Sequence, residues 1–328
     1  MAKLHLAHIH LLISHALNKD PDIMEKQIFS EISAIKSRRT LKDTLIFMEE
    51  CQIITNPHLY LCNCEGYSNR YLITEVANWK DLYTKIICRN YEEIDAAMYI
   101  HLWRRNRLAY LKYHNTLKRD VHNVIEQGQL DYFHAIHPHS TTDKKLSQSL
   151  EVEPANKSYI PAENLDKKFD WDYDTKQVFW WLSINYRLSL TEMARQLHVS
   201  RTTIKRKKEL IKEFAYIHFP TFIRSRPNYT RILSSFYTEY PGYIKETFQN
   251  LSATCYLFGN QERTLCFINT TLPSYSIEIL EELEEKSIIE DLNTGMVVRS
   301  WNRIEEEYRL GRIPEKFFWM FKKRKKDK

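Results

Sequence analysis

The sequence predicts an α+β protein built from several domains. Its 328 residues exceed the length of one ordinary domain, and a hydrophobic content of 43% is enough for real cores. Two stretches carry helical periodicity with capping residues, and the C-terminal third alternates between strand-like and helix-like segments. The expected parts are a helical domain with a hairpin at 1–78, a helical extension at 79–134, a polar linker at 135–170, a second helical domain at 171–220, an α+β domain at 221–302 and a basic tail at 303–328.

The first domain is expected to hold three helices and a hairpin. The stretch AKLHLAHIHLLISHAL has near-helical apolar spacing, and Asp20 followed by Pro21 suits the start of a second helix. Residues 37–54, SRRTLKDTLIFMEECQII, carry the apolar stripe of a third helix. The runs HLYLCNC and RYLITEV alternate as strands on either side of the turn-like EGYSN. This order is that of a winged helix-turn-helix.

Residues 22–76 resemble the winged helix of MarR-like and ArsR-like regulators, in the pattern SRRTLKDTLIFMEECQII followed by YLIT. Gln52 stands where that family usually has glycine, at a position that often needs a left-handed backbone. The resemblance implies DNA contacts at the start of the third helix and on the wing, where arginine forks suit guanine edges and phosphates. A winged helix that contacts only protein is the alternative. The implied residues are Arg38, Arg39, Thr40 and Lys42, with Arg70 on the wing.

Residues 91–127 contain neither proline nor glycine, and apolar residues recur there at intervals of three and four. This pattern predicts one or two long helices, which either mediate dimerisation or pack onto the first domain. Residues 137–170 are rich in Ser, Thr, Lys, Asn and Pro and predict a linker or a loosely packed arm.

The second helical domain is predicted from capping and packing signals together. Ser189 followed by Glu192 is a capping box that starts a short helix over 190–197. Ala194 permits a close crossing with the next helix. His198 then belongs to a turn, and Ser200 caps a third helix whose inward side chains are Ile204, Ile211 and Phe214.

This second segment resembles bacterial and archaeal helix-turn-helix regulators, including the Lrp/AsnC family, in the pattern Ala194, Leu197, Val199, Ser200, Thr203 and Ile204. His198 replaces the usual glycine of the turn, and Lys208 interrupts the apolar stripe. The first residues of a recognition helix reach base edges, whereas later basic residues reach phosphates. A solvated charged helix is the alternative. The DNA-binding residues expected here are Ser200, Arg201, Thr202, Lys205, Arg206 and Lys212.

The last domain is expected to run β-α-β-β-α-β, which is the ferredoxin-like order. The strands are predicted in YTRILSSFYTEY, ATCYLFG, RTLCFINTT and TGMVVRSW, and the helices in PGYIKETFQNL and PSYSIEILEELEEKSI. A helix-turn-helix followed by such a unit resembles the Lrp/AsnC architecture. That resemblance implies a homo-oligomer and an unidentified small-molecule effector; a purely structural domain is the alternative. The basic tail is expected either to hold DNA or acidic partners or to keep the chain in solution.

Enzymatic motifs are not found in the sequence. It contains no G-x-G-x-x-G, Walker, G-x-S-x-G or H-E-x-x-H pattern. The acids of DWDYD lack the glycine and closing glutamate of a calcium loop, and CNC has no second pair at zinc spacing. We therefore expect no catalytic site, cofactor or metal. With no bilayer-spanning run and no signal peptide, the scattered cysteines indicate reduced thiols in the cytoplasm.

The net charge of +6 permits a polyanionic partner without requiring one. Taken together, the patterns predict a cytoplasmic, sequence-specific regulator of transcription that binds double-stranded DNA as a homodimer. Two alternatives remain open, a plasmid- or virus-type replication initiator with tandem winged helices and a non-catalytic protein whose winged helices bind protein.

Overall fold

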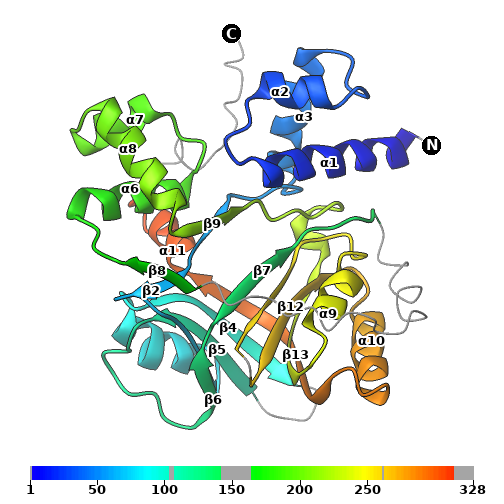
Figure 1. Cartoon of the computed structure of the whole chain (residues 1–328). Coiled ribbons are helices and arrows are strands. Elements are labelled where there is room, and N and C mark those ends of the chain that lie inside the picture. Colours follow the sequence, from blue (N-terminus) through cyan, green and yellow to red (C-terminus); the bar gives the residue numbers. More distant parts are fainter. Residues whose placement is uncertain (1, 103–106, 142–163, 261, 314–328) are drawn as a thin grey trace. The chain divides into compact units, whose positions relative to one another are not determined.

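The computed structural model describes residues 2–102, 107–141, 164–260 and 262–313, and these form helices and strands in mixed α+β architecture (Figure 1). The chain divides into two compact units. Unit 1 takes residues 1–61, 170–228 and 310–328, and unit 2 takes residues 62–169 and 229–309. Each unit therefore draws on both halves of the chain.

Unit 1 contains two helical modules. Module A has helices α1 (Ala2–Lys19), α2 (Glu25–Glu31) and α3 (Arg38–Glu50), followed by strand β1 (His58–Leu61). Module B has α6 (Tyr173–Ile184), α7 (Leu190–Leu197) and α8 (Arg201–Lys212), followed by β9 (Ala215–His218). The helices predicted around the capping residues Ser189 and Ser200 are confirmed.

Backbone pairing joins the two modules within unit 1. Strand β1 lies antiparallel to β9, with His58 opposite His218 and Leu61 opposite Ala215. Beyond this pair, the amide of Phe222 donates to the carbonyl of Ile53 at 2.7 Å. The strand after α3 in module A therefore pairs with the strand after α8 in module B, and the two modules form one folded body.

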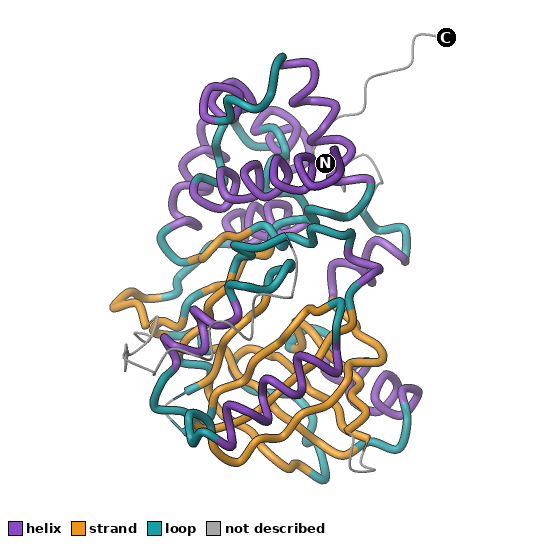
Figure 2. The backbone as a smooth tube through the Cα atoms, turned by 90° about the vertical axis from the view of Figure 1, so that its right-hand side faces the viewer, coloured by secondary structure: helices purple, strands orange, loops and turns teal. Residues whose placement is uncertain are grey.

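Unit 2 is built around a nine-stranded antiparallel sheet with the order β6-β3-β5-β4-β13-β10-β12-β11-β7. Figure 2 shows the strands gathered together with helices along them. Its strands are β3 (Asn69–Glu75), β4 (Ile94–Leu102), β5 (Arg107–His114), β6 (Val124–Gln129), β7 (Tyr132–Ile136), β10 (Thr230–Tyr237), β11 (Cys255–Gly259), β12 (Thr264–Thr270) and β13 (Glu290–Asn302). Its helices are α4 (Trp79–Asp81), η1 (Leu82–Ile87), η2 (Cys88–Asn90), α9 (Pro241–Phe248), α10 (Pro273–Glu285) and α11 (Arg303–Arg309). A separate parallel pair joins β2 (Asn63–Glu65) to β8 (Asn164–Lys168).

The nine-stranded sheet contains the same strand order twice. In the first half β3 lies between β6 and β5, with β4 beyond β5; in the second half β10 lies between β13 and β12, with β11 beyond β12. The halves join where β4 pairs with β13 and where β7 pairs with β11. The second half runs β-α-β-β-α-β as expected, whereas residues 115–123 of the first half form no helix. A helical module precedes each half, so the described residues contain an internal repeat of a helical module followed by four strands.

Each half of the sheet packs its helices on one face. In the second half, Ile244 and Phe248 of α9 and Leu280 of α10 pack with Leu257 and Ile268 from the strands in one fully buried cluster. In the first half, helices from the segment 79–90 cover a second cluster that contains Leu72, Leu111 and Trp301. Burial of these apolar faces is the main stabilising contribution to unit 2.

Two predictions for the N-terminal half are wrong. Only residues 79–90 of the expected helical extension are helical, and β4 and β5 occupy the stretch expected to form long helices. Its Ala, Leu, Arg and Lys favour helix locally, but pairing with β3 and β13 overrides that preference. The expected wing does not form either, because β1 pairs with β9 while β3, which carries Arg70, pairs with β5 and β6 in unit 2.

Other features of the chain bear on the remaining expectations. The six cysteines are free. Most of the predicted polar linker and basic tail, at 142–163 and 314–328, lies outside the described residues. Among the residues that the structure describes, no helix has the length and apolar character to cross a membrane.

Candidate nucleic-acid interface

Helices α3 and α8 begin with matching sequences, SRRTLK at 37–42 and SRTTIK at 200–205. The Ser37 hydroxyl accepts a hydrogen bond from the amide of Thr40 at 3.0 Å, and Ser200 accepts one from the amide of Thr203 at 3.0 Å. In both cases the serine and threonine hydroxyls also contact each other, at 2.9 and 2.8 Å. These N-caps satisfy backbone donors that a helix start otherwise leaves unpaired. The two helices therefore occupy equivalent places in the internal repeat.

The first two turns of α8 present one polar face. Ile204, Lys207 and Ile211 are buried and fix the orientation of the helix. The four side chains on the opposite side are exposed, and they include three positive charges; they are Arg201, Thr202, Lys205 and Arg206. All four were predicted as DNA-binding residues, and the helix brings them together on one surface because they lie at positions i, i+1, i+4 and i+5.

Lys207 serves the interior of module B. Its side chain is only 6% exposed, and its Nζ lies 2.7 Å from both carboxylate oxygens of Asp172 and 3.0 Å from the Thr175 hydroxyl. Asp172 is also the N-cap of α6, accepting from the Thr175 amide at 2.7 Å. The hydrogen bonds from Lys207 and Thr175 hold the pKa of Asp172 well below its ordinary value. One acid of the DWDYD stretch thus has a structural role.

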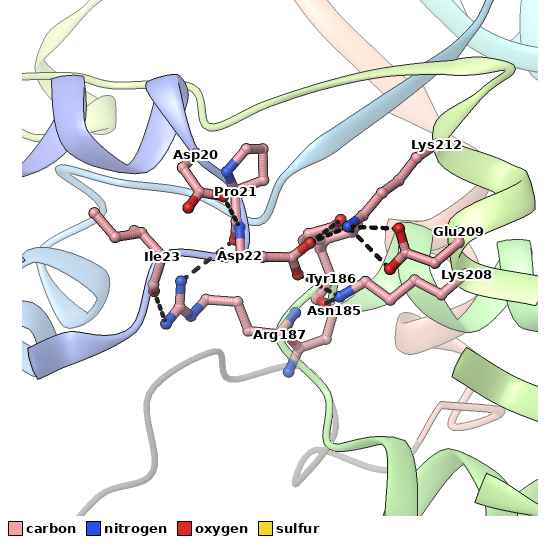
Figure 3. A network of polar contacts seen from close by, with 10 residues as sticks. All are labelled: Asp20, Pro21, Asp22, Ile23, Asn185, Tyr186, Arg187, Lys208, Glu209 and Lys212. Carbon is pink, nitrogen blue, oxygen red and sulfur yellow. Dashed lines mark hydrogen bonds and ion pairs between the residues drawn. The ribbon is translucent and has the colours of Figure 1, made fainter. Parts of the chain in front are cut away.

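Asp22 of module A receives the two remaining lysines of α8 (Figure 3). Its carboxylate lies 2.7 Å from the Nζ of Lys208 and also pairs with Lys212, and it accepts a hydrogen bond from the Tyr186 hydroxyl at 3.1 Å. Lys208 also stacks over the Tyr186 ring, with its Nζ 3.9 Å from the centroid. Burial works to raise the pKa of Asp22, but the two ammonium groups outweigh it and the pKa is lowered.

A second contact beside this network ties the same two modules together. The guanidinium of Arg187 donates to the carbonyl of Ile23 at 3.0 Å and to that of Pro21 at 3.4 Å (Figure 3). Lys208 interrupts the apolar stripe of α8, and its ammonium group pairs with the carboxylate of Asp22 in module A. The predicted phosphate contact of Lys212 remains untested, and here its Nζ also lies 3.2 Å from Glu209.

Helix α3 presents a related but different face. Its buried side chains include Leu41, Leu45 and Met48. The predicted residues Arg38, Arg39 and Thr40 are exposed at its first turn, and Lys42 is half-buried. Arg39 forms an exposed ion pair with Asp43, with 4.0 Å between Nε and the carboxylate oxygen.

Two positions flagged for replacing glycine do adopt the left-handed backbone. Gln52, after α3, has φ of 53°, and His198, between α7 and α8, has φ of 54°. Non-glycine residues pay a conformational cost there. Arg70, by contrast, is exposed on β3 of unit 2 and belongs to neither module.

A polar network in unit 2 was missed by sequence reasoning. Glu126 on β6 accepts from the Tyr71 hydroxyl at 2.7 Å and from the Ser235 hydroxyl at 3.2 Å, and its carboxylate lies 3.5 Å from Arg263. Arg263 also pairs with Asp291 at 2.6 Å. Burial, with a contribution from Glu126, raises the pKa of Tyr71. These residues link the two halves of the sheet, and no spacing in the sequence indicates that they meet. Among the described residues, no cluster of His, Cys, Asp and Glu is arranged to hold a metal ion.

Comparisons with known proteins give no family. No family model matches the chain, and no curated protein matches it. Among solved structures, the crystal structure of the siroheme decarboxylase NirDL is 11% identical, covers 92% of this chain and 97% of its own, and has a TM-score of 0.49. The same protein in complex with an iron-uroporphyrin III analogue is also 11% identical, covers 91% and 96%, and has a TM-score of 0.46.

These comparisons correct one expectation. The sequence had predicted that the chain is not an enzyme, but both matching structures are of a decarboxylase. The chain is therefore not classed among non-catalytic proteins. At 11% identity and TM-scores of 0.49 and 0.46, no activity, substrate or cofactor is assigned to it from this likeness.

Proposed function

We propose that this protein binds double-stranded DNA and acts as a sequence-specific regulator of transcription. The observation that carries the proposal is the division of the basic residues of α8. Lys207, Lys208 and Lys212 have carboxylate partners within unit 1. Arg201, Lys205 and Arg206 are exposed, and no ion pair to another described residue engages them. A basic face that is spared from internal pairing suits a polyanion.

The positions on α8 suggest separate tasks. Arg201, Thr202 and Lys205 lie on the first turns after the N-cap, from which recognition helices contact base edges. Arg206 lies at the edge of the same face and suits a phosphate. Ser200 fixes the start of the helix, because its hydroxyl accepts a hydrogen bond from the Thr203 amide. Lys212 contributes by orienting α8 through Asp22.

We also propose that a single chain carries both DNA-contacting helices, α3 and α8. Modules A and B each carry a capped helix with exposed basic residues, and β1–β9 pairing with the Asp22 contacts holds them in one unit. The two half-sheets of unit 2 share one strand order, which supports the proposal that the chain consists of two Lrp/AsnC-type halves fused in sequence. On this proposal, a single chain does what a homodimer was expected to do.

A binding titration tests the proposal. Fluorescence anisotropy with a labelled random-sequence duplex at low salt is expected to show binding by the full chain. Binding is expected to fall at least tenfold in the triple variant Arg201→Ala, Lys205→Ala, Arg206→Ala. A matched control removes three exposed positive charges from unit 2, with Lys80→Ala, Lys85→Ala and Arg89→Ala. Absence of binding at low salt would leave a protein-binding role for the modules and reject the proposal.

Mapping the bound sites separates a regulator from a replication initiator. Chromatin immunoprecipitation of the full chain is expected to place its sites beside promoters. Iterated direct repeats at an origin of replication would instead support the initiator. The measurement reports only where the chain binds on DNA, so its outcome does not depend on whether the chain also has an enzymatic activity.

A further inference from the structure

We propose that one chain reads an asymmetric DNA site, with unlike half-sites under α8 and α3. This inference rests on the proposed DNA binding and names the kind of site. It follows from the internal repeat, because α3 and α8 occupy equivalent places in the two modules but carry different side chains on their exposed faces. The equivalent serine caps at Ser37 and Ser200 set the register for the comparison.

Two of the four positions that match the exposed face of α8 carry the same residue in both helices, with Lys42 of α3 half-buried. Arg38 corresponds to Arg201, and Lys42 corresponds to Lys205. An arginine at the first position after the cap binds the O6 and N7 of a guanine with both arms of its fork. The two half-sites are therefore expected to share the base pairs that lie under these positions.

The other two outward positions differ in charge and shape. Arg39 of α3 stands where α8 has Thr202, and Asp43 stands where α8 has Arg206. Arg39 and Asp43 form an ion pair across one turn, with 4.0 Å between their atoms. Arg206 of α8 suits a phosphate at the edge of its face, and the one acid on that face, Glu209, pairs with Lys212 at 3.2 Å. At the position of Arg206, α3 has Asp43, which opposes phosphate. The α8 half-site is expected to contribute more affinity and more of the salt dependence.

The contacts that hold the two helices to the rest of unit 1 are also unequal. Lys208 and Lys212 of α8 pair with Asp22 of module A. The corresponding positions of α3 are Leu45, which is fully buried, and Glu49. The two modules therefore brace α8 through an ionic contact that α3 does not repeat in the same form. The two helices therefore differ both in their exposed faces and in the contacts that hold them in unit 1.

Two identical chains related by a two-fold axis would place identical helices on the DNA and select an inverted repeat. A single chain with unlike helices selects two different half-sites instead. At the position under Arg39, the α3 half-site is expected to demand a guanine, because the guanidinium donates to it twice. The α8 half-site has the small Thr202 there and is expected to accept a thymine through its methyl group.

The test begins with selection of bound sequences from a pool of random duplexes by the full chain. The expected result is one consensus with two unlike halves, one footprint that covers both, and one chain per duplex by analytical ultracentrifugation. An inverted repeat of identical halves overturns the inference, and so does a footprint that covers one half-site alone. Failure of DNA binding itself shows separately, as no enrichment and no low-salt binding.

An exchange variant gives a sharper result. Arg39→Thr with Asp43→Arg gives α3 the outward residues of α8. A symmetrised duplex with two copies of the α8 half-site is expected to gain about tenfold in affinity relative to the selected duplex. Glu31→Arg, at an exposed acid of module A, makes the same charge change as Asp43→Arg at a position off the reading face and is expected to leave that ratio unchanged. An unchanged ratio in the exchange variant overturns the inference.

Discussion

The carboxylate of Asp22, in the loop before α2, lies 2.7 Å from the ammonium group of Lys208 in α8. The contact joins module A to the helix of module B that carries the proposed reading face. Lys208 is 12% exposed and Asp22 is 38% exposed, so the pair is only partly shielded from water. Its importance is that it ties the orientation of one module to the other.

Asp22→Asn is expected to destabilise unit 1 by about 1–2 kcal/mol, less than the 3–5 kcal/mol typical when one partner of a fully buried pair is removed. The cost arises because Lys208 stays largely buried without its carboxylate. Chemical denaturation followed by tryptophan fluorescence measures it. Glu31→Gln, at an exposed acid of the same module, is the control and should change the free energy of unfolding by less than about 0.5 kcal/mol. Equal effects of the two substitutions would deny Asp22 this role.

Substitutions of Asp172 separate its two roles, which are the N-cap of α6 and the ion pair with Lys207. Asp172→Asn keeps a good N-cap for α6 but leaves the Lys207 ammonium buried without a negative charge, while Asp172→Ala removes both functions. We expect Asp172→Ala to lower the free energy of unfolding more than Asp172→Asn does, because only Asn can still cap α6. Adding Lys207→Met to Asp172→Asn should recover stability, because the unpaired buried charge is gone. No recovery in the double variant would count against the pairing.

His10 predicts a pH dependence for unit 1. It is 3% exposed, and burial lowers its pKa from 6.5 to about 4. The unfolded chain therefore binds a proton between these values that the folded chain refuses, so stability falls as the pH drops from 6.5 towards 4 and the loss is complete below 4. The shift corresponds to about 3 kcal/mol at most. His10→Leu should flatten that part of the stability curve; an unaltered curve would show that other groups cause it.

Substitutions at Arg201 and Lys212 distinguish a residue that would contact DNA bases from a residue that holds α8 in its orientation. Arg201→Ala is expected to reduce discrimination between the selected site and random DNA by about tenfold, as loss of a bidentate base contact does. Lys212→Ala should change that ratio less than twofold, because its ammonium group pairs with Asp22 and Glu209. Competition binding with the two duplexes gives both ratios. A loss of discrimination with Lys212→Ala but not with Arg201→Ala would reverse the assignment of the face.

Local signals were sufficient for module B. Ser189 and Ser200 cap the helices that follow them, and Ile204 and Ile211 are buried as their spacing indicates. Caps and apolar stripes depend on neighbouring residues, so the sequence contains the information directly. The β-α-β-β-α-β order of residues 230–302 was predicted for the same reason.

Contacts between residues that lie far apart in the chain could not be predicted from the sequence. Residues 94–102 and 107–114 carry helix-forming side chains, yet they form strands because β3 and β13 supply partners far along the chain. Likewise, nothing near Lys208 indicates that Asp22 neutralises it. The match between SRRTLK and SRTTIK was readable and would have revealed the internal repeat. The charge of α8 alone could not show which of its lysines were already paired.

The most direct test is the salt dependence of DNA binding by the wild-type chain and by the triple variant Arg201→Ala, Lys205→Ala, Arg206→Ala. Each phosphate contact contributes about 0.9 to the slope of log K against log salt concentration, so loss of the Arg206 phosphate contact should reduce the slope by about one. The Lys80, Lys85 and Arg89 control should keep the wild-type slope. Equal slopes for the wild type and the triple variant would contradict DNA binding through α8.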